Sequence, residues 1–234
     1  MVTAAKIDPK SPVFAPRYWY AEAERLAGVS RGTAKRWLKG YHHRGPDGEP
    51  RFRAPLIRRE HPDSDVSFAD LVEIAALKRW RDLRWPPPTI RKVAEGCRRI
   101  SGVERPLITE RFQREAGDVF ASEVAHFADL SPRQGKQAWE TMRAFLDTLD
   151  YEDDFVSAWW PRGKDVPVAI DPDYGFGLPV VVCSGLCTLL RTEFVLEQFR
   201  AGETAAAIAE DYRLPLRSIT AAIDFEASLS PEPA

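Results

Sequence analysis

Apolar residues recur at a helical spacing near the start of the chain. They predict two short helices, over residues 20–27 and 33–41, each with one apolar face. Gly28 between them suits a left-handed turn, and Ser30 suits the cap that begins the second helix. Two short helices joined by a glycine-containing turn are the pattern of a helix-turn-helix. An ordinary helical hairpin with a solvated basic face is the alternative.

A basic stretch follows the second helix. The sequence GPDG at 45–48 is a strong turn signal, and it divides residues 42–60 into two short arms. A basic hairpin after a recognition helix is a wing, which contacts the DNA backbone or minor groove. A disordered basic loop is the alternative, and it would supply the same electrostatic attraction.

Two longer amphipathic helices complete this part of the chain. Ser67 and Asp70 have the spacing of a capping box at the start of a helix that runs to about Arg84. A Trp-Pro-Pro-Pro run ends that helix, and the next one is predicted over 89–100. Together these elements predict a winged helix-turn-helix over 17–106.

Beyond residue 106 short apolar runs mix with helical patterns. The predicted strands are 107–112, 118–121, 155–161 and 166–170, and the predicted helices are 137–149, 193–201, 204–212 and 215–228. The expected fold class is therefore mainly α with small β elements (α+β), ending in a three-helix, helix-turn-helix-like bundle. The expected segments are a flexible leader (1–16), the winged helix-turn-helix (17–106), a connecting or dimerisation region with a strand hairpin and a helix (107–165), a helical domain (166–229) and a frayed tail (230–234).

Charge divides the chain unequally, although its formal net charge is only −2. Residues 17–106 hold 20 Lys and Arg against 12 Asp and Glu, a net charge of +8. Residues 107–234 hold 11 against 22, a net charge of −11. The basic part predicts a polyanion partner, which the acidic part would repel, so the acidic part is expected to have another role.

The candidate DNA contacts follow from this distribution. They lie on the second helix, on the hairpin and at the start of the helix over 89–100, where side chains of DNA-binding proteins contact bases and phosphates. The candidates are Ser30, Arg31, Thr33, Lys35, Arg36, Lys39, Tyr41, Arg44, Arg51, Arg53, Arg91 and Lys92.

The C-terminal helices also have the pattern of a second helix-turn-helix. Thr204 suits the cap of its first helix, and residues 212–214 suit the turn. Its second helix carries Arg217 but also Asp224 and Glu226, which DNA would repel. Dimerisation or protein binding is the favoured interpretation of this part.

Composition points to a cytoplasmic protein. Hydrophobic residues make up 44% and charged residues 29%, which is enough apolar material for a core. No apolar run approaches the ~18–20 residues of a membrane helix, and the N-terminus lacks a signal pattern. Cys97, Cys183 and Cys187 are expected to be reduced thiols.

No catalytic chemistry is expected. The acidic run at 150–154 is interpreted as a solvated loop, because consecutive carboxylates point in different directions. The pair HH at 42–43 and the cysteines at 183 and 187 complete no zinc set. The sequence GFG at 175–177 lacks the strand-then-helix frame of a nucleotide site. The chain is therefore expected to be no enzyme and to hold no cofactor or metal.

Two parts of the chain resemble known families. The motifs SFADL at 67–71 and TIRK at 89–92 resemble the MerR-like winged domain. The C-terminal part is similar to a small bacterial domain of antitoxins whose toxins are PIN-type ribonucleases. That similarity rests on IDP at 170–172, GFGLPV at 175–180, FRAGET at 199–204, IAEDY at 208–212 and ITAAI at 219–223. The segment VVCSGLCT at 181–188 departs from the polar turn of that family, so no partner contact is carried over there.

The combination covers nearly the whole chain and resembles the longer VapB-type antitoxins that carry their own DNA-binding domain. The resemblance implies a homodimeric autorepressor that binds operator DNA and neutralises a PIN-type toxin by direct binding. A ligand-responsive MerR-like regulator is the alternative, with a pocket lined by Trp159, Trp160, Tyr174 and Phe176. A nucleoid-type architectural protein is a third interpretation, and it predicts little sequence preference.

Overall fold

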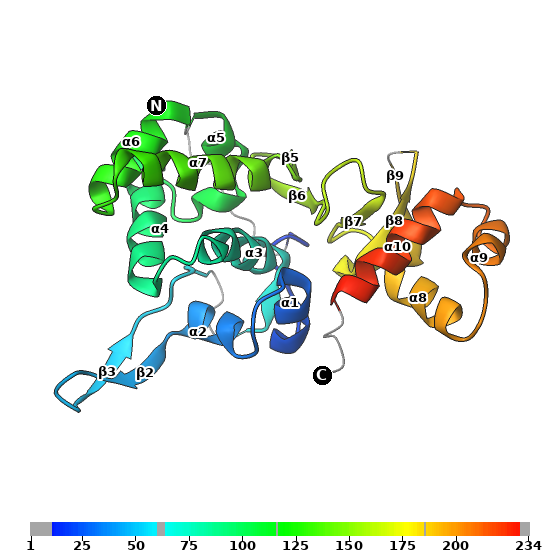
Figure 1. Ribbon diagram of the computed structural model, residues 1–234, viewed down its shortest axis with the longest axis horizontal. Helices are drawn as coiled ribbons and strands as arrows, with labels where there is room; N and C mark the ends of the chain where they lie inside the picture. The colour runs from blue at the N-terminus through cyan, green and yellow to red at the C-terminus, as the bar shows by residue number, and fades with distance from the viewer. Residues whose placement is uncertain (1–10, 60–63, 116, 185, 230–234) are drawn as a thin grey trace. The chain divides into compact units, whose positions relative to one another are not determined.

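Figure 1 shows the computed structural model, which describes residues 11–59, 64–115, 117–184 and 186–229. The chain forms two compact units. The first runs to Leu146 and includes Tyr151–Val156, and the second comprises Asp147–Asp150 and the chain from Ser157 onward. Helices and strands occur in both units, so the fold is mixed α and β. Residues 1–10 of the predicted leader and the predicted tail 230–234 lie outside the described residues.

The first unit is built around one helix that is buried on most of its sides. This helix, α3 (Phe68–Asp82), buries eleven of its 15 residues, as expected for a helix in the centre of a core. Its predicted capping box is confirmed: the Asp70 N–H donates to Ser67 Oγ (3.1 Å), and the Ser67 N–H donates to Asp70 Oδ2 (3.0 Å). The other elements of the unit are β1 (Pro16–Tyr18), α1 (Tyr20–Ala27), α2 (Thr33–Lys39), β2 (Tyr41–Arg44), β3 (Pro50–Arg53), β4 (Val66–Ser67), α4 (Pro87–Ser101), η1 (Pro106–Ile108), α5 (Glu110–Glu115), α6 (Gly117–Phe127) and α7 (Pro132–Leu146).

The strands predicted over 107–112 and 118–121 are wrong, because these residues belong to η1, α5 and α6. The short apolar runs there are the start of a longer helical pattern, in which Phe120, Val124 and Ala128 are buried at successive turns. Gly135 on α7 allows α6 to approach closely, since a Cβ there would lie 2.4 Å from the Ala121 carbonyl oxygen. Of the region expected to connect two domains (107–165), residues 107–146 therefore belong to the first unit, whereas 147–150 and 157–165 belong to the second.

The second unit combines most of a five-stranded sheet with three helices. Its helices α8 (Thr192–Arg200), α9 (Ala205–Asp211) and α10 (Leu216–Leu229) confirm the predicted C-terminal bundle. Val181, Val195, Ile208 and Ile219 form an apolar cluster between strand and helices. The sheet has the order β5-β6-β7-β8-β9, with antiparallel pairing from β6 to β9, and a short η2 (Gly175–Gly177) precedes β8. The strands are β5 (Leu149–Glu152), β6 (Phe155–Trp159), β7 (Val168–Ile170), β8 (Pro179–Cys183) and β9 (Leu186–Arg191).

The turn between β5 and β6 packs within the first unit. The Asp154 carbonyl accepts from the Glu110 N–H (3.0 Å), and Asp154 Oδ1 accepts from the Arg111 N–H (2.9 Å), so this residue caps α5. Phe155 meets Phe14 edge to face, with ring centroids 5.2 Å apart. Phe14 is 3% exposed, so the part of the predicted flexible leader that the structure describes is packed against the core.

Candidate nucleic-acid interface

Helices α1 and α2 are joined by a tight turn whose left-handed residue is the expected glycine. Gly28 has φ 66°, and its N–H donates to the Arg25 carbonyl (3.2 Å). From α1 the buried Glu24 reaches across the turn, where its Oε1 accepts from the Ala34 N–H (2.9 Å). Glu24 therefore satisfies an amide of the first turn of α2, a role that sequence analysis missed because glutamate is usually a surface residue.

Two predictions about the start of α2 are wrong. The residue at the N-cap is Gly32 rather than Ser30, whose hydroxyl bonds the Thr33 hydroxyl (2.9 Å) instead of a backbone amide. Thr33 itself is fully buried, and its Oγ1 accepts from Arg36 (3.2 Å). Thr33 therefore cannot touch DNA in this arrangement, since the first turn of α2 packs inward around it.

Four exposed cations remain on and beside α2: Arg31, Lys35, Arg36 and Lys39. None of them forms an ion pair with any carboxylate in the described parts of the chain. An exposed helix whose cations lack acidic partners is suited to a polyanion, because no intramolecular pair must be broken on binding.

The hairpin after α2 consists of β2 and β3, with the predicted GPDG sequence in its turn. Arg44 and Arg51 are exposed, while Tyr41 and Arg53 are half-buried and face each other across the strands. Arg51 is paired with Asp47 of the turn, so its charge is partly neutralised. The hairpin therefore adds Arg44 and the partly neutralised Arg51 to the exposed basic residues of α2.

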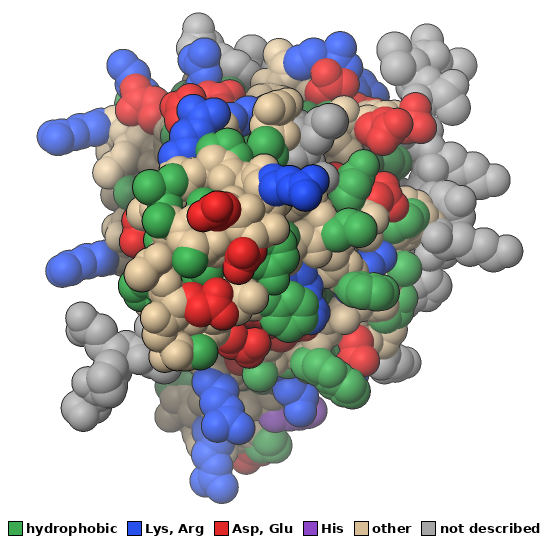
Figure 2. All heavy atoms as spheres, turned by 90° about the vertical axis from the view of Figure 1, so that its right-hand side faces the viewer, with side chains coloured by type: hydrophobic (Ala, Val, Ile, Leu, Met, Phe, Trp, Pro, Cys, Tyr) green, Lys and Arg blue, Asp and Glu red, His purple; other side chains and the backbone are tan. Residues whose placement is uncertain are grey.

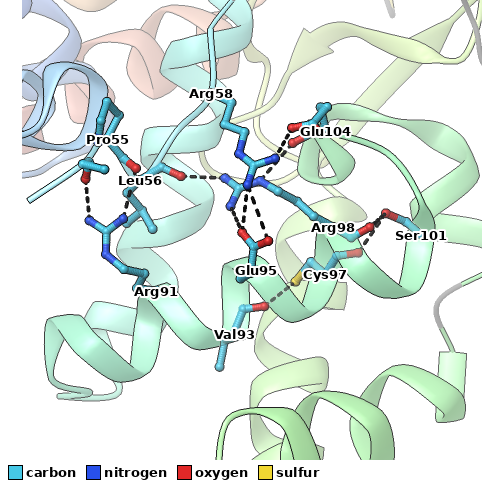
Figure 3. A network of polar contacts seen from close by, with 11 residues as sticks. Pro55, Leu56, Arg58, Arg91, Val93, Glu95, Cys97, Arg98, Ser101 and Glu104 are labelled. Atoms are coloured by element: carbon cyan, nitrogen blue, oxygen red, sulfur yellow. Dashed lines mark hydrogen bonds and ion pairs between the residues drawn. The ribbon is translucent and has the colours of Figure 1, made fainter.

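Arginines of α4 hold the segment that leaves the hairpin, as Figure 3 shows. Arg91 donates to the carbonyls of Pro55 (3.0 Å) and Ala54 (2.8 Å), and Arg98 donates to the Leu56 carbonyl (2.6 Å). Arg91, predicted to contact DNA, is thus engaged with the chain's own backbone. Lys92, also predicted to contact DNA, is paired with Asp129.

A buried ion-pair network lies behind this surface. Asp70 accepts from Arg59 Nε (2.9 Å) and from Arg105 Nη2 (2.9 Å), and Arg105 Nε also donates to Glu73 (2.9 Å). All four side chains are almost wholly buried. Burial raises the pKa of Glu73 above its ordinary value, and the Arg105 guanidinium opposes that rise. The network joins the segment after the hairpin to α3, and its long-range pairs had no local signal in the sequence.

The second unit has a different surface. Its described residues hold 6 Lys and Arg against 12 Asp and Glu. Phe194, Phe199 and Tyr212 are each between 40% and 44% exposed, and the Tyr212 hydroxyl accepts from Gln198 Nε2 (3.1 Å). Figure 2 faces this part of the molecule and shows hydrophobic side chains beside carboxylates. Such a surface suits a protein more than DNA.

The residues considered for metal binding, nucleophilic chemistry or a ligand pocket lie in different environments. Within the described residues no three His, Cys, Asp or Glu side chains gather as metal ligands would. Burial raises the pKa of the Cys97 thiol, which disfavours a nucleophilic thiolate. The aromatic residues considered for a ligand pocket differ in environment, since Trp159 is buried whereas Phe176 is 81% exposed. No helix in the described residues is long and apolar enough to cross a membrane.

The fold has a counterpart among solved structures. The crystal structure of Rv2018 from Mycobacterium tuberculosis matches with a TM-score of 0.64 at 24% identity, over 90% of this chain and 98% of that chain. No family model matches the sequence.

Two proteins of the same organism are similar in sequence. One is named "Putative antitoxin VapB45" and is 27% identical over 226 residues, 89% of this chain and 93% of that protein. The other, "Uncharacterized protein Rv2308", is 28% identical over 221 residues, 89% of each chain. The chain is thus a distant homologue of a protein named as an antitoxin, along nearly its whole length.

Proposed function

We propose that this protein is the antitoxin of a type II toxin–antitoxin module, which binds its operator through the first unit and its toxin through the second. The observation that carries the proposal is the similarity to the protein named VapB45, which covers both units. The division of charge supports it, because the basic surface of α2 and the acidic second unit suit different partners.

For DNA, the first unit acts as a winged helix-turn-helix of the MerR-like kind. Helix α2 enters the major groove, with Arg31, Lys35, Arg36 and Lys39 available for bases and phosphates. The hairpin follows the backbone with Arg44 and the other basic side chains of its strands. A homodimer would read two half-sites and so obtain the specificity of an autorepressor.

The DNA claim is tested with a duplex that carries the sequence upstream of the protein's own gene. We expect this duplex to bind at least ~10³-fold more tightly than an unrelated duplex at physiological salt. Arg31→Ala should weaken that binding by about 1–3 kcal/mol if Arg31 contacts a base edge. Arg217→Ala, which removes an exposed arginine from the second unit, is the matched control. Equal competition by unrelated DNA would instead favour an architectural protein.

For the toxin, the acidic second unit offers exposed aromatic side chains on α8 and at the end of α9. Aromatic residues are the usual anchors of protein interfaces, and surrounding carboxylates attract a basic partner. A PIN-type ribonuclease has to bind RNA, so its substrate-binding surface has the complementary charge. Binding there would block the RNA site.

The partner claim is tested by co-expressing the chain with the product of its neighbouring gene. We expect the two to purify together, and Phe199→Ala with Tyr212→Ala to weaken the complex by about 2 kcal/mol or more. Phe52→Ala removes an exposed phenylalanine from the first unit and should leave the complex intact. A protein that purifies alone and monodisperse beside that neighbour would overturn the toxin partner.

A further inference from the structure

A cavity of about 340 Å³ opens in the first unit between α2, the hairpin, the end of α3 and the start of α4. Four arginines line it: Arg36 from α2, Arg53 from β3, Arg81 from α3 and Arg91 from α4. No Asp or Glu belongs to the lining. The four side chains come from four separate elements, so the fold itself brings these like charges together.

Among the described residues no carboxylate compensates the charges in this cavity, although Arg36 and Arg81 both donate to Thr33 Oγ1 (3.2 and 3.5 Å). Arg36, Arg53 and Arg81 form no ion pair with any residue that the structure describes, and Arg91 is bonded to carbonyls rather than carboxylates. Burial and the Arg53 guanidinium lower the pKa of Arg91 from its ordinary value. Guanidinium groups held together without a counter-charge repel one another, and an anion in the cavity would relieve that repulsion.

Three aromatic rings and the aliphatic side chains of Leu56, Pro87 and Ile90 form the other walls. Trp37, Tyr41 and Trp85 line the cavity together with the arginines, and Trp85 is 9% exposed. Planar guanidinium groups bind phosphate oxygens in pairs, and indole or phenol faces stack on planar bases. The volume falls within the range of ~300–1,000 Å³ that is usual for small-molecule sites.

We propose that this cavity binds a phosphate group that carries an aromatic base, the chemistry of a nucleotide. Arg36, Arg53 and Arg81 hold the phosphate, and Trp37 and Trp85 contact the base. Two sources supply this chemistry: a nucleotide of a DNA strand that the first unit holds, or a free mononucleotide. Because Arg36, Tyr41 and Arg53 also belong to the proposed DNA surface, a free nucleotide would compete with DNA.

The first arm of the test titrates the full-length protein with adenosine monophosphate, inorganic phosphate and adenosine by calorimetry. A free-nucleotide site binds the monophosphate more tightly than either fragment, and Arg81→Gln weakens this binding at least fivefold. Arg84→Gln removes an exposed arginine three residues further on, outside the lining, and should change nothing. Arg53→Gln is a second cavity variant if Arg81→Gln does not fold.

The second arm measures the salt dependence of binding to a duplex. If a DNA phosphate occupies the cavity, Arg81→Gln lowers the slope of log K against log salt by about 1, and Arg84→Gln leaves it unchanged. The proposal is overturned if neither nucleotide affinity nor the slope responds to the cavity variants, or if Arg84→Gln has the same effect as Arg81→Gln. If the wild type binds no duplex, the proposed function fails while the nucleotide arm still decides the cavity.

Discussion

The helix pairs α1–α2 and α9–α10 share one backbone turn. Gly28 and Arg213 are both left-handed, with φ 66° and 54°. In the first turn the Val29 N–H donates to the Glu24 carbonyl (3.0 Å), and in the second the Leu214 N–H donates to the Ala209 carbonyl (2.9 Å). Each pair is a short helix, a link of five (28–32) or four (212–215) residues and a second helix, which is the local pattern of a helix-turn-helix.

The two pairs differ in what surrounds the turn. In the first pair, the buried Glu24 of α1 accepts from an amide of α2, and α2 exposes cations. In the second pair, α9 is capped by Thr204 at its own N-terminus, whose Oγ1 accepts from the Ala207 N–H (3.2 Å). Helix α10 packs on an apolar cluster and exposes Asp224 as well as Arg217. The turn therefore fixes the geometry of a helix pair, and the surface of its second helix decides which partner it suits.

The largest expected effect comes from the buried charges behind the first pair. Asp70→Ala leaves Arg59 and Arg105 without their shared carboxylate, so we expect a loss of about 3–5 kcal/mol in the free energy of unfolding. Urea denaturation followed by tryptophan fluorescence measures it. Asp82→Ala removes an exposed carboxylate paired with Lys78 and should cost less than about 1 kcal/mol. Equal losses would show that the network contributes no more than a surface pair.

The next largest difference between the two helix pairs is expected in the stability lost when the cap of each is removed. Glu24→Ala leaves the Ala34 N–H buried without an acceptor, and we expect a loss of about 1–3 kcal/mol. Thr204→Ala removes an exposed cap and should cost about 1 kcal/mol. The same denaturation experiment compares them, with Glu24→Gln as a variant that keeps an acceptor oxygen. A smaller loss for Glu24→Ala than for Thr204→Ala would contradict the role of Glu24.

Substitutions at the two left-handed residues should change the stability of the protein in opposite directions. Gly28→Ala places a Cβ at φ 66°, which costs about 1–2 kcal/mol. Arg213→Gly removes such a Cβ and should stabilise the protein by less than about 1 kcal/mol, because glycine also loses entropy on folding. Thermal unfolding of the two variants checks the signs, and a loss in both would mean that Arg213 makes contacts worth more than the strain.

The smallest effect is expected at Ser30. Among the described residues its hydroxyl bonds only the Thr33 hydroxyl, so Ser30→Ala should change the free energy of unfolding by less than about 0.5 kcal/mol. A loss close to that of Thr204→Ala would restore Ser30 as the cap of α2.

Local signals in the sequence predicted much of the fold. The capping box at Ser67, the turn at Gly28 and the three C-terminal helices were found because each depends on residues close in sequence. Strands β8 and β9 were missed, since a run such as PVVVC is equally compatible with a buried helix segment. The predicted DNA surface kept its exposed cations on α2 but lost Thr33, because burial depends on packing from distant elements such as α3.

The two units are not separated at a single point of the chain, and this limits which gene fragments encode a complete first unit. The chain passes between the units at residues 146/147, 150/151 and 156/157. A gene fragment ending at Leu146 would leave the amides of Glu110 and Arg111 without Asp154 and Phe14 without Phe155. A junction after Leu146 therefore cannot transfer the first unit intact, whereas a junction after Val156 can, but it also carries residues 147–150 of the second unit. That junction falls within β6, so an exchange of the first unit between related proteins would divide a strand of the sheet.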